Sequence, residues 1–342
     1  MEDWMIYFIA FGIVFFIFVI GCVIGSFLNV VILRAFSGES IVLPPSKCPK
    51  CGNKLKWWHN IPILSYIFLR GKCGFCHEKI SIQYPIVEFI TGCLFVALFF
   101  KFGLRPSLLF VYAVASLLIV ISVTDIKEKV VFDKHTYALV GIGLFYNLVS
   151  TVIFVWNKLV TTGFVLDGSW FFSNYLTMSL LGILVGVVIM EIAARIGYII
   201  AGERAFGEGD TYIAAGLGAV FGWKNVIVIL LMSIAIQLVM TLPLFLKKLY
   251  CNKKWQTLSA LVSFFVYVIA YFVVQNCTEL FENVWILLVA MIILAILGVW
   301  ACVSVIQGLK DRDTLTYLPF GPAMAIAGIV MLFINSLINI PF

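Results

Sequence analysis

Long apolar runs constrain the fold of this chain more than any other feature. Most of them approach or exceed the roughly 20 apolar residues that a helix needs to cross a bilayer. We expect spans near 4–33, 84–103, 107–124, 133–155, 173–201, 211–222, 224–246, 256–275, 284–308 and 320–340, of which 211–222 is short for a full crossing. The sequence, 63% hydrophobic, therefore predicts an all-α polytopic integral membrane protein with about ten transmembrane helices.

Basic residues are distributed unevenly between the loops. The loops 34–83, 125–134, 195–210, 247–255 and 309–319 hold 19 of the 23 Lys and Arg residues. Because basic residues favour the cytoplasmic side, we expect these loops in the cytosol and both termini outside. The first span has no cleavage signal and is expected to remain in the mature protein. Anionic lipid on the cytoplasmic side explains the net charge of +6 without a nucleic-acid partner.

The first of these loops carries four cysteines in two C-x2-C pairs. Cys48 and Cys51 form one pair, and Cys73 and Cys76 form the other. Two such turns can close a tetrathiolate zinc site of the ribbon type, with Gly52 and Gly74 permitting the turns. Four protein sulfurs leave no position for water, so the zinc would be structural. Free thiols or two disulfides are the alternatives, and a reducing cytosol disfavours the disulfides.

Two aspartates lie at span ends on the same predicted side of the membrane. Asp125 ends the span 107–124, and Asp210 opens the short run 211–222. Carboxylates held close can share a proton, so that one activates a water and the other protonates the carbonyl under attack. Gly207 and Gly209 would let a substrate backbone approach Asp210. The pattern therefore predicts an aspartic-protease pair.

Less specific interpretations of these acids also fit the pattern. Asp125 and Asp133 could be solvated loop acids among lysines, and Asp210 could be an ordinary helix cap. A proton-coupled transporter also places acids in the membrane. Elsewhere, Gly141, Gly143, Gly182 and Gly186 are expected to let helices approach closely, and we find no internal repeat.

Six segments, in order, resemble the type IV prepilin peptidase family of G-x-G-D membrane aspartic proteases. They are GSFLNVVILR (25–34), the double C-x2-C loop, SIQYPIVEFITG (81–92), TDIKEKVVFD (124–133), GEGD (207–210) and LPFGPAMAIAG (318–328). The resemblance runs from residue 21 to about residue 330. A single G-x-G-D would be weak evidence, whereas six ordered motifs are specific.

The resemblance implies a function and site residues. Asp125 and Asp210 match the catalytic pair, and the implied reaction removes a basic leader, after its last glycine, from type IV prepilins or pseudopilins at the cytoplasmic face of the bacterial inner membrane. Many members also methylate the new N-terminus with S-adenosylmethionine, so a bifunctional enzyme is implied. Glu88 and Asp133 are auxiliary candidates, and Glu88 is the first guess for a polar group near the methyl donor, against a plain role in anchoring its span. The oligomeric state is not indicated.

The sequence departs from the family pattern in several places. Val131-Phe132-Asp133 stands where members have a proline before the acid, and Thr211-Tyr212-Ile213 follows the second aspartate in place of x-K-L. Residues 246–318 form a longer connection than usual. The predicted organisation is a first span (1–33), a tetracysteine loop (34–83), a peptidase core (84–245), an inserted helix pair (246–318) and a last helix with the P-F-G-P motif (319–342).

Three alternatives to this interpretation remain open. A presenilin-type protease also uses G-x-G-D, but the chain has neither a Y-D partner motif nor a P-A-L segment. A proton-coupled transporter with a zinc-ribbon loop would predict inverted repeats. A non-catalytic pilus-assembly scaffold would need neither aspartate.

Overall fold

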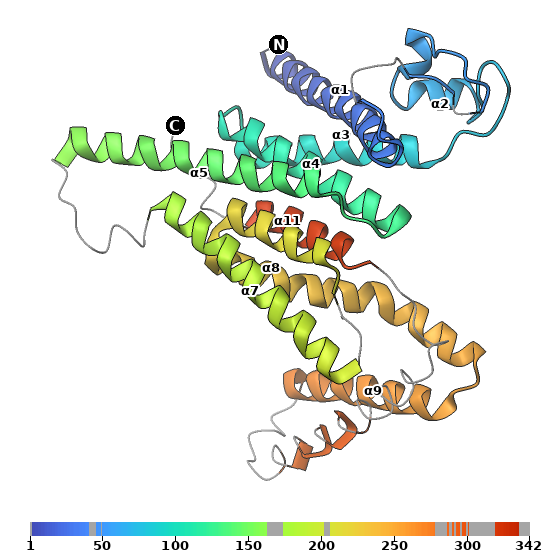
Figure 1. Cartoon of the computed structure of the whole chain (residues 1–342), viewed down its shortest axis with the longest axis vertical. Coiled ribbons are helices and arrows are strands. Elements are labelled where there is room, and N and C mark those ends of the chain that lie inside the picture. Colours follow the sequence, from blue (N-terminus) through green and yellow to red (C-terminus); the bar gives the residue numbers. More distant parts are fainter. Residues whose placement is uncertain are drawn as a thin grey trace. The chain divides into compact units, whose positions relative to one another are not determined.

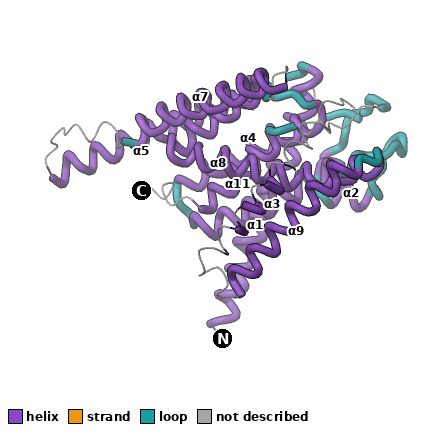
Figure 2. Tube along the Cα trace, turned by 90° about the horizontal axis from the view of Figure 1, so that it is seen from below, coloured by secondary structure: helices purple, strands orange, loops and turns teal. Residues whose placement is uncertain are grey.

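The computed structural model describes residues 2–40, 46–48, 50–162, 174–201, 206–277 and 319–334, and isolated positions between 286 and 300. These residues form helices joined by loops, and among them there is no β-strand, only two isolated β-bridges (Figures 1 and 2). In chain order the elements are α1 (Glu2–Ser37), η1 (Trp57–Asn60), α2 (Leu64–Phe68), α3 (Gln83–Phe102), α4 (Ser107–Glu128), α5 (Asp133–Thr162), α7 (Tyr175–Ala201), α8 (Glu208–Cys251), α9 (Trp255–Cys277) and α11 (Gly321–Ile334). A bilayer offers backbone groups no hydrogen-bond partners, so a helix is the form that spans it.

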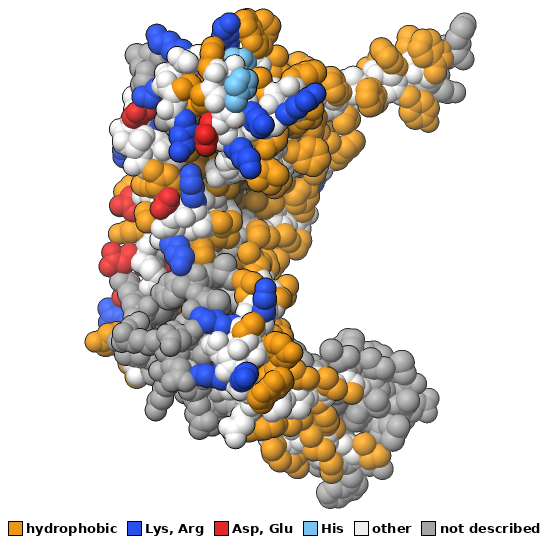
Figure 3. All heavy atoms as spheres, turned by 90° about the vertical axis from the view of Figure 1, so that its right-hand side faces the viewer, with side chains coloured by type: hydrophobic (Ala, Val, Ile, Leu, Met, Phe, Trp, Pro, Cys, Tyr) orange, Lys and Arg blue, Asp and Glu red, His pale blue; other side chains and the backbone are white. Residues whose placement is uncertain are grey.

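The prediction of an all-α multi-pass membrane protein is confirmed. Within the described residues six helices are long and apolar enough to cross a membrane: α1, α3, α4, α5, α7 and α8. Large apolar side chains such as Tyr7 (75% exposed), Phe8 (70%) and Leu109 (74%) cover their flanks, and hydrophobic side chains cover much of the face in Figure 3. The predicted number of about ten spans is not established, because 284–308 lies largely outside the described residues.

The two predicted spans 211–222 and 224–246 lie on one element, α8, which breaks at Gly222. This glycine has φ 78° and ψ 171°, a conformation that side chains disfavour. The segment before it is about 21 Å long at 1.5 Å per residue, too short for the roughly 30 Å hydrocarbon core. It is buried on all sides from Ile213 to Gly222, as expected for an apolar helix in the centre of a bundle.

The chain divides into two compact units. The first comprises Met1–Ile236 and Pro319–Phe342, and the second comprises Gln237–Leu318. In the second unit, Leu249 of α8 and Leu261 of α9 form a small core with their apolar neighbours. The residues of both candidate sites lie in the first unit.

Glycines allow helices to surround the first segment of α8. A Cβ placed on Gly143 of α5 would lie 2.8 Å from the Ala219 backbone, and one on Gly186 of α7 would lie 2.6 Å from the Ala214 carbonyl oxygen. Gly182 of α7 faces Gly218 in the same way, backbone against backbone. The predicted close approach is confirmed for Gly143, Gly182 and Gly186, and it is wrong for Gly141, which has no atom within 4 Å of such a Cβ.

Several helix ends of the first unit meet on one side of the bundle. Phe36 of α1 packs on Phe132 before α5 with ring centroids 5.1 Å apart. Phe206 before α8 packs on Phe320 before α11 at 5.0 Å. At the opposite end, Lys101 of α3 donates to the Leu332 carbonyl oxygen of α11 at 2.9 Å. The two aromatic contacts join helix ends next to the loops 34–83 and 125–134, and next to the loops 195–210 and 309–319. All four loops were assigned to the same side of the membrane from their basic residues.

Candidate active site and metal centre

Asp125 lies in the last turn of α4 and is only 4% exposed. The backbone N–H of Gly321 donates a hydrogen bond of 2.9 Å to its Oδ2 atom. Gly321 is the first residue of α11, so this N–H is one of the amides that a helix leaves without an internal partner. The carboxylate therefore faces the positive end of α11, which offsets its unfavourable place at the negative end of α4.

Asp210 lies in the first turn of α8, three residues after Gly207. The Gly207 N–H donates to Asp210 Oδ2 at 3.1 Å, and the Asp210 N–H donates to the Gly207 carbonyl oxygen at 3.2 Å. This is the carboxylate half of a capping box, so the helix-cap interpretation is geometrically correct. It engages one oxygen atom and does not exclude a chemical role for the carboxyl group.

The fold brings together the helix ends that carry the two aspartates, although 84 intervening residues separate them. A Cβ on Gly321 would meet both the carboxyl group of Asp125 and the side chain of Ile213 in the first segment of α8, and the Phe206–Phe320 contact holds together the segments that lead into α8 and α11. Asp125 thus lies beside the start of α11, and Asp210 lies in the first turn of α8. The catalytic assignment of the pair remains a prediction at this stage.

The glycines beside Asp210 differ in their surroundings. Gly207 is exposed, and a Cβ there would meet nothing closer than 3.8 Å. A Cβ on Gly209 would lie 2.6 Å from the Cβ of Val131. The absence of a side chain at 209 is thus explained by packing on the segment between α4 and α5, whereas Gly207 has the open surface that the substrate-approach hypothesis needs.

The auxiliary candidates Asp133 and Glu88 lie in different places. Asp133 is exposed at the first position of α5, where it faces Tyr137 one turn later. Tyr137 in turn contacts Tyr212 of α8, with ring centroids 5.9 Å apart. Glu88 of α3 is 6% exposed and lies at the tetracysteine loop, not at the aspartates.

The four cysteines form one cluster, in which all Sγ atoms lie within 4.8 Å of one another. Cys48 Sγ and Cys76 Sγ are 3.9 Å apart. Four sulfurs at 2.3 Å from a tetrahedral ion would be about 3.8 Å apart, so the donor set fits a metal of the size and softness of zinc. The cluster can hold a metal ion, as the spacing predicted.

The two cysteine turns are copies of one structure, displaced by 25 positions. Cys48 N–H donates to Asn53 O at 3.0 Å and Cys73 N–H donates to Glu78 O at 2.8 Å, and the β-bridges Lys47–Lys54 and Lys72–Lys79 close each turn. The two C-x2-C pairs that were predicted to form the turns of one metal site thus share one backbone hydrogen-bond pattern. In the sequence, both turns have the pattern K-C-x2-C-x2-K.

The turn residues also differ from the prediction. Gly52 has φ 70°, as expected, but in the second turn the left-handed residue is His77, with φ 55°, and not Gly74. His77 holds the position equivalent to Gly52, because each follows its second cysteine directly. Gly74 is small for another reason: a Cβ there would lie 3.1 Å from His59 Nε2.

The protonation of the cluster favours a bound cation. Backbone N–H groups of Cys76 and Phe75 point at the Cys73 sulfur and lower the pKa of Cys73 to about 7. The Glu78 N–H lowers the pKa of Cys76, but desolvation and the adjacent sulfurs outweigh it and raise the pKa of Cys76 to about 12. The adjacent thiols of Cys73 and Cys76 therefore do not both ionise by themselves, and a divalent metal would supply the missing positive charge.

Sequence reasoning missed the role of Gly321. The P-F-G-P motif contributed to the family resemblance, but nothing in it announces a hydrogen bond to a residue 196 positions away. Pro322 directly after Gly321 was the available signal, because proline is favoured in the first turn of a helix. An exposed helix start cannot be distinguished by sequence from one that faces a buried carboxyl group.

Fold and site together define a class: multi-pass α-helical membrane proteins with two aspartates at helix ends, an arrangement expected of membrane aspartic peptidases. The chain belongs to the type IV leader peptidase family. Residues 112–242 match that family, and residues 19–102 match the Bacterial Peptidase A24 N-terminal domain. These ranges contain the four cysteines, Glu88 and both aspartates.

Several bacterial proteins named "Prepilin leader peptidase/N-methyltransferase" are similar to the chain. The protein of Neisseria gonorrhoeae is 31% identical over 65% of this chain and 78% of its own length. The protein of Klebsiella pneumoniae is 30% identical over 61% of this chain and 85% of its own length. The protein of Myxococcus xanthus is 35% identical over 64% of this chain, which spans 59% of that relative's length. No solved structure matches the chain.

Proposed function

We propose that the chain is a prepilin leader peptidase that also methylates the N-terminus it creates. Its substrates would be type IV prepilins or pseudopilins, cleaved after the last glycine of a basic leader. The observation that carries the peptidase is that Asp125 and Asp210 lie at helix ends that meet around Gly321. The names of the relatives, which state both activities, support the pairing of cleavage with methylation.

In the proposed cleavage, one carboxylate takes a proton from a water molecule, and the water oxygen attacks the scissile carbonyl carbon. The other carboxyl group protonates the carbonyl oxygen. Collapse of the tetrahedral intermediate breaks the C–N bond, and the leaving nitrogen takes a proton to become the new amino terminus. The Gly321 and Gly207 amides, each bonded to one carboxyl oxygen, keep the two groups in place.

We propose that the metal is zinc and that its role is structural. The cysteine turns hold a soft tetrahedral ion through four sulfurs and leave no ligand position for substrate. We propose that the protein lies in the bacterial inner membrane. The distribution of basic residues favours an orientation in which the cysteine loop and both aspartates face the cytosol. A basic leader would then lie in the cytosol while the apolar helix of the prepilin lies in the bilayer.

A synthetic prepilin with a basic leader, Gly, Phe and an apolar helix tests this function. Detergent-purified, zinc-loaded enzyme should release the leader, and with S-adenosylmethionine the product should gain one methyl group by mass spectrometry. Asp125→Asn and Asp210→Asn should each lower cleavage at least about 100-fold, because acid–base groups contribute on that order. Wild-type turnover in either folded variant would refute the catalytic pair, and ion flux without cleavage would favour the transporter.

A further inference from the structure

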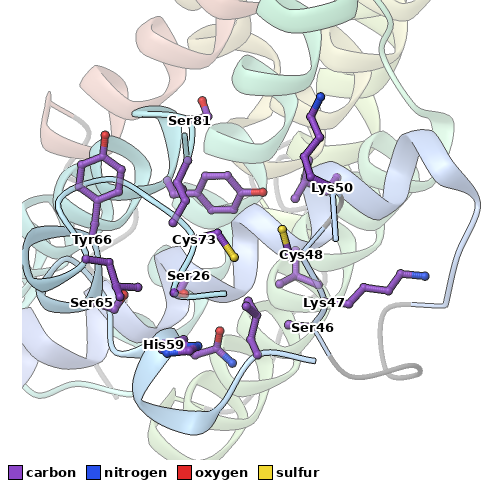
Figure 4. A pocket seen from close by; sticks show the side chains of 18 of the residues that line it. Ser26, Ser46, Lys47, Cys48, Lys50, His59, Ser65, Tyr66, Cys73 and Ser81 are labelled. Carbon is purple, nitrogen blue, oxygen red and sulfur yellow. The ribbon is translucent and has the colours of Figure 1, made fainter. Parts of the chain in front are cut away.

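A cavity of about 550 Å³ lies between the tetracysteine loop, α1 and the start of α3 (Figure 4). Ser26, Val30 and Leu33 of α1 line one side, and Tyr84 and Glu88 of α3 line another. Small-molecule sites in proteins typically enclose about 300–1,000 Å³. The cavity is separate from both aspartates, and cleavage as proposed above does not use it.

The most buried charged residue that lines this cavity is Glu88, which is 6% exposed. Its Oε2 atom accepts the Ile63 N–H at 2.8 Å, and Ser26 of α1 hydrogen-bonds the same carboxyl group. Among the described residues Glu88 forms no ion pair, although Lys47, Lys50 and Lys79 lie at the cavity wall. A buried carboxylate is stable when a cation pairs with it, so the cavity suits a ligand with a positively charged centre.

The metal cluster forms part of the same wall. Cys48 and Cys73, the two buried cysteines, line the cavity, whereas Cys51 and Cys76 are exposed. Figure 4 shows the side chains of Cys48 and Cys73 on this wall, and their sulfur atoms lie within 4.8 Å of each other. A metal ion in the cluster would therefore hold together the two cysteine turns that form this part of the wall.

One short segment connects this cavity with the aspartates. Residues 127–132 comprise the last two residues of α4, which carries Asp125, and the loop before α5. Lys127 lies 5.8 Å from the Phe36 ring, and Phe132 packs on Phe36 at the end of α1, next to the cavity wall. Val131 contacts Gly209 beside Asp210. The cavity and the aspartate pair therefore lie on the same side of the bundle and share one contact segment.

We propose that this cavity binds the sulfonium methyl donor S-adenosylmethionine, with Glu88 facing its cationic portion. The inference rests on the proposed function, which needs a donor site near the place where the new amino terminus appears. When bound, the donor supplies its methyl group: the amine nitrogen forms the N–C bond, the C–S bond breaks with its electron pair on sulfur, and the nitrogen releases a proton to solvent. Tyr66 and Tyr84 offer ring surfaces on the cavity wall for the adenine.

A purely structural role for Glu88 must be distinguished from this one. Ile63, which donates to Glu88, has φ 62°, a strained value for a β-branched residue. Strained residues concentrate at ligand-holding sites, but the hydrogen bond alone could serve only to anchor the loop. Glu88→Gln separates the two roles, because the amide oxygen still accepts the Ile63 N–H while the negative charge is lost.

The test measures S-adenosylmethionine binding to the zinc-loaded, full-length enzyme in detergent. Glu88→Gln should weaken binding at least tenfold, with zinc content and thermal midpoint retained. Glu191→Gln is the matched control: this exposed acid pairs with Arg195 at 3.2 Å on α7 and should bind the donor as the wild type does. A folded Glu88→Gln variant with wild-type affinity would overturn the assignment.

Photocrosslinking of radiolabelled S-adenosylmethionine to the wild-type enzyme gives a second result that does not depend on any variant. Label in residues 26–37 or 46–88 is expected, and label confined to other segments contradicts the site. If the label lies only in other segments and the enzyme still methylates its product, the cavity assignment is refuted while the proposed function stands. A wild type that cleaves prepilin but neither binds the donor nor methylates would refute the methyl-transfer part of the proposed function, and this inference with it.

Discussion

Gly321 donates its backbone N–H to Asp125 Oδ2 at 2.9 Å across 196 residues of sequence. The hydrogen bond joins the start of α11 to the end of α4, where the buried carboxyl group lies. A Cβ atom at position 321 would overlap the same Oδ2 atom. The absence of a side chain at 321 therefore decides where the Asp125 carboxyl group can be.

Gly321→Ala should displace Asp125 and lower prepilin cleavage at least tenfold while the helices remain folded. Gly321 does not have a positive φ, so the effect would come from the overlap and not from backbone strain. Cleavage rates and thermal midpoints in detergent measure it. Gly141→Ala is the control, because its Cβ would enter open space. Unchanged cleavage in Gly321→Ala would show that Asp125 does not need this position.

Gly218→Ala should destabilise the whole first unit. Its Cβ would overlap the carbonyl group of Gly182, and both contacting groups are backbone that cannot rotate away. Overpacking of a core typically costs about 1–3 kcal/mol, and the cost here should lie at the upper end. Thermal unfolding in detergent should show a lower midpoint. A midpoint equal to that of Gly141→Ala would mean that α7 and α8 can separate without loss.

The features predicted correctly from sequence are those with local signals. Apolar runs mark the helices, and C-x2-C spacing marks the four sulfurs. Asp125 and Asp210 also stand out, because charges at the ends of apolar runs are rare, and their catalytic role stays a prediction. The break of α8 at Gly222 coincides with the predicted boundary between the short apolar run 211–222 and the longer run 224–246.

The features missed depend on contacts between distant residues. Gly321 meets Asp125, and Gly209 meets Val131, only after α11 and α8 have packed into the bundle. The cavity beside Glu88 exists because a loop folds over two helices, and no single segment encodes it. His77 was missed for a different reason: Gly74, close by, offered the simpler explanation of the second turn.

Metal removal should affect methyl transfer more than cleavage. Among the described residues, the hydrogen bonds to Asp125 and Asp210 come from Gly321 and Gly207 and not from the cysteine loop, whereas Cys48 and Cys73 form part of the cavity wall. Cys48→Ser should lose bound zinc and lower S-adenosylmethionine affinity at least tenfold. Cys93→Ser, which removes an exposed cysteine outside the cluster, is the control. Equal loss of both activities in Cys48→Ser would show that the loop supports the whole fold.

His77→Gly should tighten zinc binding. His77 adopts φ 55° at the position where the first turn has Gly52 at φ 70°. The left-handed conformation costs a non-glycine residue about 1–2 kcal/mol, so glycine should relieve roughly 1 kcal/mol in the metal-bound loop, or about a fivefold gain in affinity. Competition with a chromogenic chelator measures this gain. Gly52→Ala is the converse variant and should weaken zinc binding, because alanine there meets open space but must adopt the disfavoured φ. A weaker zinc complex in His77→Gly would mean that the imidazole itself contributes to the site, and that the two turns are equivalent in backbone only.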